Sequence, residues 1–367
     1  MSQKPNKPWQ KDPAPFIDHG ESLETKPELL TDFITPNDKF FVCNETYTPS
    51  IDLTGYTLKI GGDAVNQPLE LSYEAVLKLP SHTVISYLEC AGNLRDFYET
   101  VLNGELPDDE EFGSLRWGTG AVGNAVWTGV SIRTVLEMAG LKPEVVMVNA
   151  KGLDADSAEG GVSRPMPIEK ALDPDTILAY HMNGEKLPPD HGYPFRLIVP
   201  GWIGTNSVKW VGEIVASTAE IKVRRNTEHY VFIGPEWEPD GEVLGELITT
   251  QNIKSTLALG WQAELTAGKQ IVKGNGRSPH APITKVEWSD DGGQTWQEAR
   301  LIPPLMKYAW ALFEFEWDPK PGNHTLMTRA TDEAGNTQPM AHPFNLEGYL
   351  FNMVFPHPVT VKSRKHP

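Results

Sequence analysis

Cysteine is scarce in this 367-residue chain, which contains only Cys43 and Cys90. The sequence has no CxxC or CxxCH motif and no Cys/His spacing typical of zinc sites. It therefore argues against structural zinc, c-type haem and cysteine-ligated iron–sulfur clusters. Two cysteines do not make a disulfide framework in a chain of this size, although the count alone permits one Cys43–Cys90 bridge.

Long hydrophobic runs are also missing. No run approaches 18 apolar residues, so we expect no membrane span. The stretch from Met1 to Gly20 is polar and rich in proline, and it lacks the basic start, apolar segment and twin-arginine pair of export signals. If Met1 is the native start, we expect a cytoplasmic protein; if a signal was removed, we expect a periplasmic one.

Positive charge is in deficit, because 32 Lys and Arg face 49 Asp and Glu, giving a formal net charge of −17. This balance argues against nucleic acid or an anionic membrane as a partner. A site for an anionic ligand must then concentrate the few cations locally. The GxGxxG and GxxxxGK[ST] motifs are absent as well, so dinucleotide and P-loop sites are not supported.

Three regions differ in composition. Residues 1–35 contain several prolines and are expected to form an extended arm. Residues 36–245 mix short β-rich runs with helices, which predicts an α+β domain rather than a doubly wound sheet. Residues 246–367 carry short alternating strands with regular turn signals, which predicts an all-β sandwich of Ig-like size.

The periodicity also predicts individual elements. Helices are expected at 72–77 and at 131–139, the second ended by Gly140. Strands are expected over 40–43, 56–60, 83–90, 196–199, 285–288, 294–296, 311–317 and 326–330.

Cys90 is the most informative residue. It ends the apolar run that begins at Thr83, and Ala91-Gly92-Asn93 then breaks the chain. Strand ends suit chemistry because a rigid scaffold aims the side chain while the next loop leaves room for a ligand. A soft thiolate there is a good single ligand for a transition metal. The alternative is a small buried residue, which is the commoner role of a free cysteine.

The order and spacing of four blocks resemble the sulfite oxidase family of molybdenum-cofactor (molybdopterin) oxidoreductases, in its bacterial form without a haem domain. The resemblance runs from about residue 27 to the C-terminus. The blocks are Thr35–Asn37 with Phe40–Glu45; Cys90-Ala91-Gly92-Asn93-Leu94-Arg95 with 117–121 and 127–130; 178–196 with Ser207–Trp210; and Ser289–Trp296 with Asn345-Leu346-Glu347-Gly348.

The resemblance implies how the cofactor is bound. Cys90 would be the one protein ligand to molybdenum, beside the two sulfurs of the pyranopterin. His191, Arg196 and Lys209 match positions that bind the pterin and its phosphate, and their chemistry agrees, since Arg and Lys suit phosphate. The further implied cofactor contacts are Phe41, Val42, Cys43, Asn44, Glu45, Asp154, Ser207 and Val208.

The resemblance also implies an activity, namely oxygen-atom transfer at a Mo-oxo centre that oxidises sulfite to sulfate. Arg95 would position the anion, Tyr230 would donate a hydrogen bond near the oxo group, and Trp117 would wall the substrate pocket. The sandwich would form a homodimer. No haem segment is recognised in the chain, so electrons are expected to leave to a separate acceptor protein such as a cytochrome.

The substrate pocket departs from the family pattern. Cys43 and Glu347 stand where arginines are expected, and Glu45 stands where a histidine is expected. The expectation is therefore a weakened site for a small oxyanion, unless Arg116, Arg224 or Arg225 replaces the missing cations.

Two other interpretations stay open. The same cofactor could serve a reductase of a sulfoxide or of nitrate, and loss of pocket arginines suits a neutral sulfoxide better than nitrate. Alternatively, the chain could be a non-catalytic molybdopterin-binding dimer, against which the retention of Cys90, Arg95 and Tyr230 argues.

Overall fold

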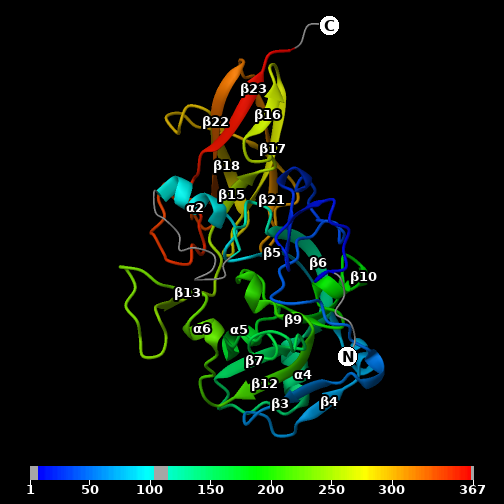
Figure 1. Ribbon diagram of the computed structural model, residues 1–367. Helices are drawn as coiled ribbons and strands as arrows, with labels where there is room; N and C mark the ends of the chain where they lie inside the picture. The colour runs from blue at the N-terminus through cyan, green and yellow to red at the C-terminus, as the bar shows by residue number, and fades with distance from the viewer. Residues whose placement is uncertain (1–6, 103–114, 365–367) are drawn as a thin grey trace.

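Two sheets with helices between them form the lower part of the molecule, and two further sheets form a sandwich above them (Figure 1). The computed structural model describes residues 7–102 and 115–364. The predicted fold class, an α+β domain followed by an all-β sandwich, is confirmed.

The first sheet of the α+β domain is antiparallel and carries Cys90 at its end. Its order is β10–β9–β6–β5, with β11 paired to β9. The strands are β5 (Ser81–Glu89), β6 (Val122–Ser131), β9 (Ile177–Met182), β10 (Glu185–Lys186) and β11 (Arg196–Ile198).

The second sheet of this domain has the order β4–β3–β12–β7–β8. Strands β3 and β12 run parallel, and the other pairs are antiparallel. The strands are β3 (Leu58–Gly61), β4 (Leu69–Leu71), β7 (Met147–Gly152), β8 (Met166–Pro167) and β12 (Val211–Ser217).

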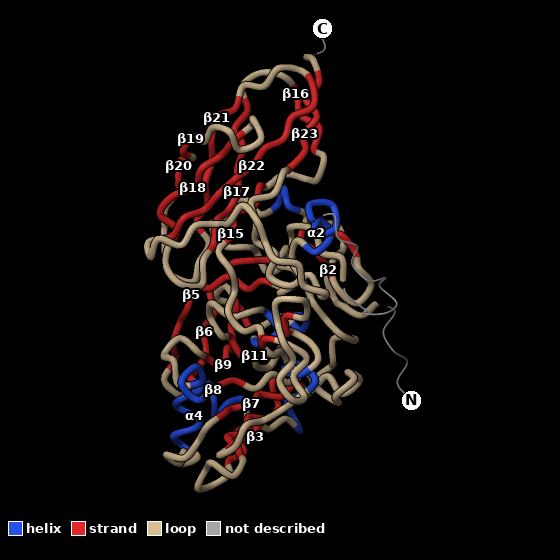
Figure 2. Tube along the Cα trace, turned by 90° about the vertical axis from the view of Figure 1, so that its left-hand side faces the viewer, coloured by secondary structure: helices blue, strands red, loops and turns tan. Residues whose placement is uncertain are grey.

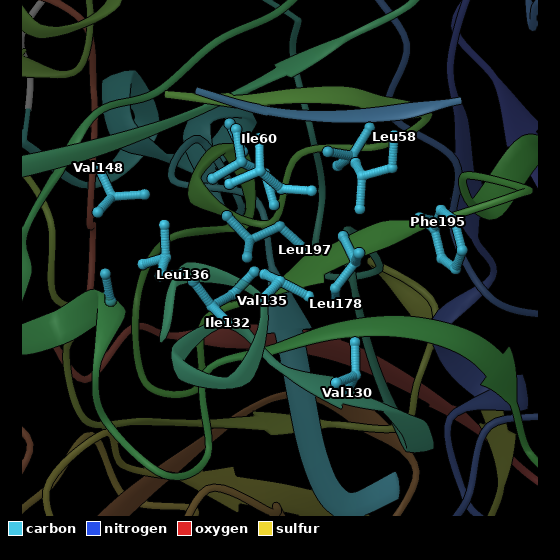
Figure 3. Close-up of a cluster of buried hydrophobic side chains, with 14 of the residues drawn as sticks. Leu58, Ile60, Val130, Ile132, Val135, Leu136, Val148, Leu178, Phe195 and Leu197 are labelled. Carbon is cyan, nitrogen blue, oxygen red and sulfur yellow. The ribbon is translucent and has the colours of Figure 1, made fainter. Parts of the chain in front are cut away.

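The main core lies between these two sheets. Figure 3 shows Leu58 and Ile60 of β3 above, Val130 of β6 below, and side chains of helix α4 (Ile132–Met138) between them. The helix predicted over 131–139 is confirmed, and the chain turns at Gly140, whose φ is 69°. A left-handed residue of this kind is a common helix stop.

The short helices connect strands on both sides of the core. They are η1 (Pro27–Leu29), η2 (Leu53–Gly55), α1 (Tyr73–Leu77), α2 (Arg95–Leu102), α5 (Ile168–Ala171), η3 (Pro189–His191), η4 (Gly204–Asn206) and α6 (Arg224–Thr227). The helix predicted over 72–77 is confirmed as α1, with the hydroxyl of Ser72 accepting a hydrogen bond from the amide of Ala75. None of the helices in the described ranges is long and apolar enough to cross a membrane.

The sandwich packs a four-stranded sheet, β15–β17–β21–β20, on a five-stranded sheet, β16–β23–β22–β18–β19 (Figure 2). On β21 the buried Phe313, Phe315 and Trp317 alternate with less buried glutamates, as the sequence predicts. The strands are β15 (Lys254–Leu257), β16 (Ala263–Thr266), β17 (Gln270–Arg277), β18 (Ile283–Ser289), β19 (Gln297–Glu298), β20 (Arg300–Ile302), β21 (Ala311–Trp317), β22 (Gly322–Asp332) and β23 (His357–Lys362).

Two further strand pairs lie outside these sheets. β1 (Phe16–Asp18) and β2 (Leu23–Thr25) form a hairpin within the stretch predicted as an arm, and β13 (Val231–Phe232) pairs with β14 (Glu246–Leu247). Trp9, Phe16, Leu23 and Val42 form a small buried cluster under the hairpin.

Two predicted strands are wrong. Over 40–43 only Val42 forms a bridge, to Leu23, because the ammonium of Lys11 binds the carbonyl oxygens of Asn37 and Phe40. The return strand predicted over 294–296 begins at Gln297 instead, because the carboxylate of Asp291 accepts the amides of residues 294 and 295. In both places a side chain takes backbone groups that a sheet would need.

Candidate active site

Cys90 directly follows β5, where the ladder with β6 ends. Its amide donates to the carbonyl of Ala121 at 3.0 Å, and its carbonyl accepts from the amide of Asn93 at 3.0 Å. The turn continues through Leu94, whose φ is 78°, into helix α2. The side chain is partly buried and not in a disulfide.

A cavity of about 430 Å³ opens beside Cys90. Every residue that the sequence predicts for the site lines it, although they come from both domains. They are Phe41, Val42, Cys43, Asn44, Glu45, Cys90, Arg95, Trp117, Asp154, His191, Arg196, Ser207, Val208, Lys209, Tyr230 and Glu347. Of the arginines proposed as substitutes, Arg224 and Arg225 line this cavity, whereas Arg116 lines a second one.

His191, Arg196 and Lys209 form the cationic side of the cavity. Arg196 donates to the carbonyls of Ser207 at 3.2 Å and of His191 at 3.4 Å. Lys209 donates to the amide oxygen of Asn44 and, at 3.1 Å, to the carbonyl of Asp190. These acceptors are all uncharged, so the positive groups are held in place without being neutralised by them.

Burial disfavours charge on this side. It lowers the pKa of Lys209 to about 7 and that of Arg196 to about 9, and it holds the pKa of His191 well below its usual value. Burial also raises the pKa of Asp154, whose carboxylate accepts from the amide of Val162 at 2.9 Å. An anion placed among these groups would offset the cost, which fits the terminal phosphate of a pterin.

Cys43 and Cys90 both line the cavity, and each thiol influences the other. Cys43 is exposed to the cavity. The neighbouring thiol of Cys90 and the positive charges of Lys209 and Arg196 lower the pKa of Cys43 to about 7, although desolvation inside the cavity opposes them. The thiol pair therefore lies between the cationic side and Arg95, whose charge acts on Cys90.

Arg95 lies on the opposite side, fixed by backbone carbonyls. Its Nε donates to the carbonyl of Glu347 at 2.7 Å, and its Nη1 donates to that of Leu115 at 2.9 Å. Its guanidinium also lies 5.0 Å from the ring centre of Tyr349. Arg95 is 5% exposed, so its orientation is set by packing before any substrate enters.

Glu45, Glu159 and Glu347 form the acidic side. Arg225 is held between the first two, with its Nη2 2.5 Å from Glu45 and its Nη1 in contact with Glu159. These carboxylates raise the pKa of Arg225, although its burial opposes them. Glu347 is 4% exposed, and one of its oxygens lies 3.9 Å from Nδ1 of His229.

Arg225 was one candidate to replace the missing cations, but its position alone fits that role. Its guanidinium reaches the cavity but is occupied by two carboxylates. Arg224, the other candidate here, donates to Glu228 at 2.8 Å. Of Arg95, Arg224 and Arg225, Arg95 is the one whose described side-chain partners are neutral groups.

Tyr230 stands in a left-handed backbone conformation, with φ of 55°, and its ring stacks on Tyr349 at 5.2 Å. Burial, together with negative charge at Cys90 and Cys43, raises the pKa of Tyr230 to about 12. The phenol is therefore a hydrogen-bond donor at neutral pH. The guanidinium of Arg164 also lies 5.3 Å from the centre of the Tyr230 ring.

Sequence reasoning missed Tyr349, Arg164 and the pairing of Arg225. Tyr349 could have been found, because it follows Glu347-Gly348, a block already singled out. Arg164 and Arg225 carried no such signal, since their roles depend on partners far away in the sequence. Within the described residues, no group of three or more His, Cys, Asp or Glu could hold a metal ion.

Comparison with known proteins agrees with this arrangement. Residues 45–224 match the family described as the oxidoreductase molybdopterin binding domain, and residues 247–362 match the Mo-co oxidoreductase dimerisation domain. The chain is 34% identical to mitochondrial sulfite oxidase of Rattus norvegicus over 348 residues, covering 90% of this chain and 62% of that protein. It is also 34% identical to sulfite oxidase of Gallus gallus, covering 90% and 74% respectively.

A solved structure is also similar. The sulfane dehydrogenase SoxCD from Paracoccus pantotrophus superposes with a TM-score of 0.79 at 28% identity, covering 91% of this chain and 82% of that one. The chain thus spans less than two thirds of the rat relative's length but most of the length of this structural neighbour.

Proposed function

Because this chain belongs to the sulfite oxidase family of molybdopterin oxidoreductases, with molybdenum and molybdopterin as its cofactor, we propose that it oxidises sulfite to sulfate with reduced affinity for the dianion. The observation that carries the proposal is the cavity itself. It brings the thiol of Cys90 between a side suited to phosphate and the fixed guanidinium of Arg95.

The residues present fit the cofactor. Cys90 would bind molybdenum, and Arg196, Lys209 and His191 would hold the pterin and its phosphate, with Asn44 and Asp154 beside them. When bound, the cofactor supplies two-electron oxygen-atom transfer chemistry. The backbone of Cys90 is held by β5 and the turn after it, so little further ordering of this residue is needed when the cofactor binds.

Arg95 and Tyr230 would act on the substrate. The guanidinium of Arg95 is held at two of its nitrogens, so it presents its remaining donors to an anion in a fixed direction. The phenol of Tyr230 keeps its proton because its pKa is about 12, and it can therefore donate a hydrogen bond to a substrate oxygen. Trp117, 1% exposed, excludes water from one wall.

The acidic side would weaken sulfite binding. A charge-assisted hydrogen bond contributes about 1.5–3 kcal/mol, so losing two of them at Cys43 and Glu347 weakens binding by about two to four powers of ten. Glu347 adds repulsion if it is ionised, because its carboxylate is buried in the cavity wall. The occupied guanidinium of Arg225 does not restore the missing contacts.

An anaerobic sulfite titration of molybdenum-loaded protein, followed by the Mo(VI) absorbance, tests the proposal. We expect bleaching that needs millimolar rather than micromolar sulfite. Dithionite serves as the control for a reducible metal. If dithionite reduces the metal while sulfite does not do so at any concentration, sulfite is not a substrate.

A second candidate is reduction of a neutral sulfur compound such as a sulfoxide. The observation that favours it is the buried carboxylate of Glu347, which when ionised repels dianions but not neutral molecules. Reduced viologen as electron donor distinguishes the two directions. Viologen oxidation that depends on a sulfoxide, with no sulfite oxidation, would favour the reductase. Tightly bound molybdopterin with neither activity would indicate a non-catalytic dimer.

The match of residues 247–362 to a dimerisation domain supports a homodimer formed through the sandwich. We also propose a separate electron-acceptor protein, such as a cytochrome, because two electrons must leave the metal after each oxidation. Light scattering at several protein concentrations tests the dimer. A single mass near 40.7 kDa at all concentrations would contradict it.

A further inference from the structure

Glu89 directly precedes Cys90 but points to the other face of the strand, toward the sandwich. Its carboxylate receives two hydrogen bonds of 2.8 Å from the guanidinium of Arg277 and one of 2.9 Å from the side-chain amide of Asn93. The ammonium of Lys254 lies 2.9 Å from the same carboxylate. The side chains of the three charged residues are 0% exposed.

This cluster joins the two domains at the residue before the thiol. Arg277 ends β17 and Lys254 begins β15, whereas Glu89 ends β5. The carbonyl of Glu89 also accepts from the side chain of Gln251 at 2.7 Å. Both the side chain and the backbone of Glu89 are therefore held by residues that follow the α+β domain.

Asn93 extends the connection around Cys90. Its side-chain oxygen accepts from the amide of Ala121 at 3.1 Å, and the carbonyl of Ala121 accepts from the amide of Cys90. The turn that carries the thiol is thus fixed from two directions, by β6 and by the sandwich. A displacement of the sandwich relative to β5 would move Cys90.

The charges in the cluster do not cancel, because one carboxylate faces two cations. Arg277 engages both carboxylate oxygens in the geometry that Arg favours. The ammonium of Lys254 contacts Glu89 but makes no hydrogen bond of good geometry with any described group. Burial lowers the pKa of Lys254, while negative charge at Glu89 and, more weakly, at Cys90 opposes that shift, so Lys254 interacts with both groups.

Stability alone is a weak reason for such a cluster. Buried ion triads lose about as much in desolvation as they gain in attraction, and apolar replacements are often equally stable. A buried charge with incomplete partners therefore calls for another role. Because Glu89 is one residue from the thiol proposed to bind the metal, the role of the cluster is sought at that thiol.

We propose that Glu89, Arg277 and Lys254 are positioning residues through which the sandwich fixes Cys90 and places an uncompensated positive charge against the residue that precedes it. The inference rests on the proposed function in one respect, that Cys90 binds molybdenum. A nearby cation stabilises the more electron-rich state of a metal site, so the cluster favours the reduced metal. The sandwich then tunes the metal site in addition to any part it has in a dimer.

Lys254→Met tests the charge, because methionine is unbranched and apolar and fills a similar volume. The readout is the Mo(VI)/Mo(V) equilibrium of the loaded protein in a redox titration followed by the Mo(V) electron paramagnetic resonance signal. We expect at least a tenfold shift toward Mo(VI), which is about 59 mV for one electron. Lys254→Arg keeps the charge and should restore the wild-type equilibrium.

Lys285→Met is the matched control, since Lys285 pairs with Glu287 at 3.2 Å in the same sandwich but is 42% exposed. It should leave the equilibrium unchanged. Thermal unfolding of each variant confirms that the compared proteins are folded. If Lys254→Met behaves as this control does, the proposal is overturned.

The variant Cys90→Ser separates the proposed role of the cluster from the proposal that Cys90 binds molybdenum. If Cys90→Ser keeps the wild-type Mo(V) signal, the assignment of Cys90 to the metal fails, and the inference fails with it. If Cys90→Ser changes the signal while Lys254→Met leaves the equilibrium unchanged, only the tuning role of the cluster fails.

Discussion

The two sides of the cavity differ in how their charges are matched. On the cationic side, Arg196 and Lys209 make hydrogen bonds to neutral oxygens, so their charge remains available to a ligand. On the acidic side, Arg225 is already occupied by Glu45 and Glu159. The first arrangement suits an anion that stays bound. The second leaves little positive charge for an anion that must enter and leave.

This difference indicates that cofactor and substrate sites can vary independently in one cavity. Cys43 lies where they meet, because its thiol contacts Cys90 and its charge interacts with Lys209. Replacing residues on the acidic side should therefore change the substrate without loss of cofactor, and replacing residues on the cationic side should do the reverse.

Replacing Cys90 should have the largest effect on turnover. For Cys90→Ser we expect turnover to fall by about four orders of magnitude or more, as when an essential active-site residue is lost. The measurement is kcat with the artificial acceptor ferricyanide, together with molybdenum content. Retained turnover at normal metal content would mean that Cys90 is not the ligand.

Placing arginines at positions 43 and 347 should have the next largest effect, on the substrate side of the cavity. In the double variant Cys43→Arg and Glu347→Arg we expect the KM for sulfite to fall by about two to four powers of ten, because two charge-assisted contacts return. Glu316→Arg is a control for net charge, since it changes the charge by two of the three units at an exposed position on β21. An equal fall in KM in this control would attribute the effect to long-range attraction.

Tyr230→Phe should have a smaller effect, confined to the substrate side. Loss of one hydrogen bond to an anion costs about 1.5–3 kcal/mol, so we expect kcat to fall by about tenfold to a hundredfold with molybdenum content unchanged. Steady-state kinetics and metal analysis on the same samples test this. Loss of metal in step with activity would assign Tyr230 to the cofactor instead.

Lys209→Met should have the smallest effect, on the stability of the cofactor-free protein. Because burial lowers the pKa of Lys209 to about 7, the folded state pays the full cost of its charge below pH 7. That cost disappears as pH rises toward the ordinary value of 10.5, so the wild type gains stability from this group between pH 7 and 10.5. The variant should melt a few degrees higher at pH 6.5, at about 2–4 °C per kcal/mol, and the gain should shrink by pH 10.

Lys78→Met, on an exposed helix end, is the control for that experiment. A gain in Lys209→Met that is independent of pH would contradict the electrostatic explanation. The variant should also retain less cofactor than the wild type at pH 6.5, since it lacks a phosphate donor.

Local pattern was enough to predict much of this molecule. The end of β5 at Cys90, helix α4 and the alternation on β21 all follow from periodicity and turn residues. These features depend on neighbours in the sequence, which is why the sequence shows them. Arg196 and Lys209 were assigned to the site in another way, by the resemblance to the sulfite oxidase family.

What could not be predicted depends on distant partners. The strand predicted over 40–43 does not form where Lys11 binds the carbonyl of Phe40. Arg225 was one of three candidates to replace the missing cations, and its partners Glu45 and Glu159 could not be foreseen. The same is true of Glu89 and Arg277, which are 188 positions apart. Composition and spacing carry no information about such pairs.

One contact has a consequence for how the protein is made. Arg95 is held by the carbonyl of Glu347, and these residues lie 252 positions apart. At synthesis rates of about 5–20 residues per second, roughly 13 to 50 seconds separate their emergence from the ribosome. The wall that orients Arg95 is therefore translated well after Arg95 itself, and the complete cavity exists only once Glu347 has left the ribosome.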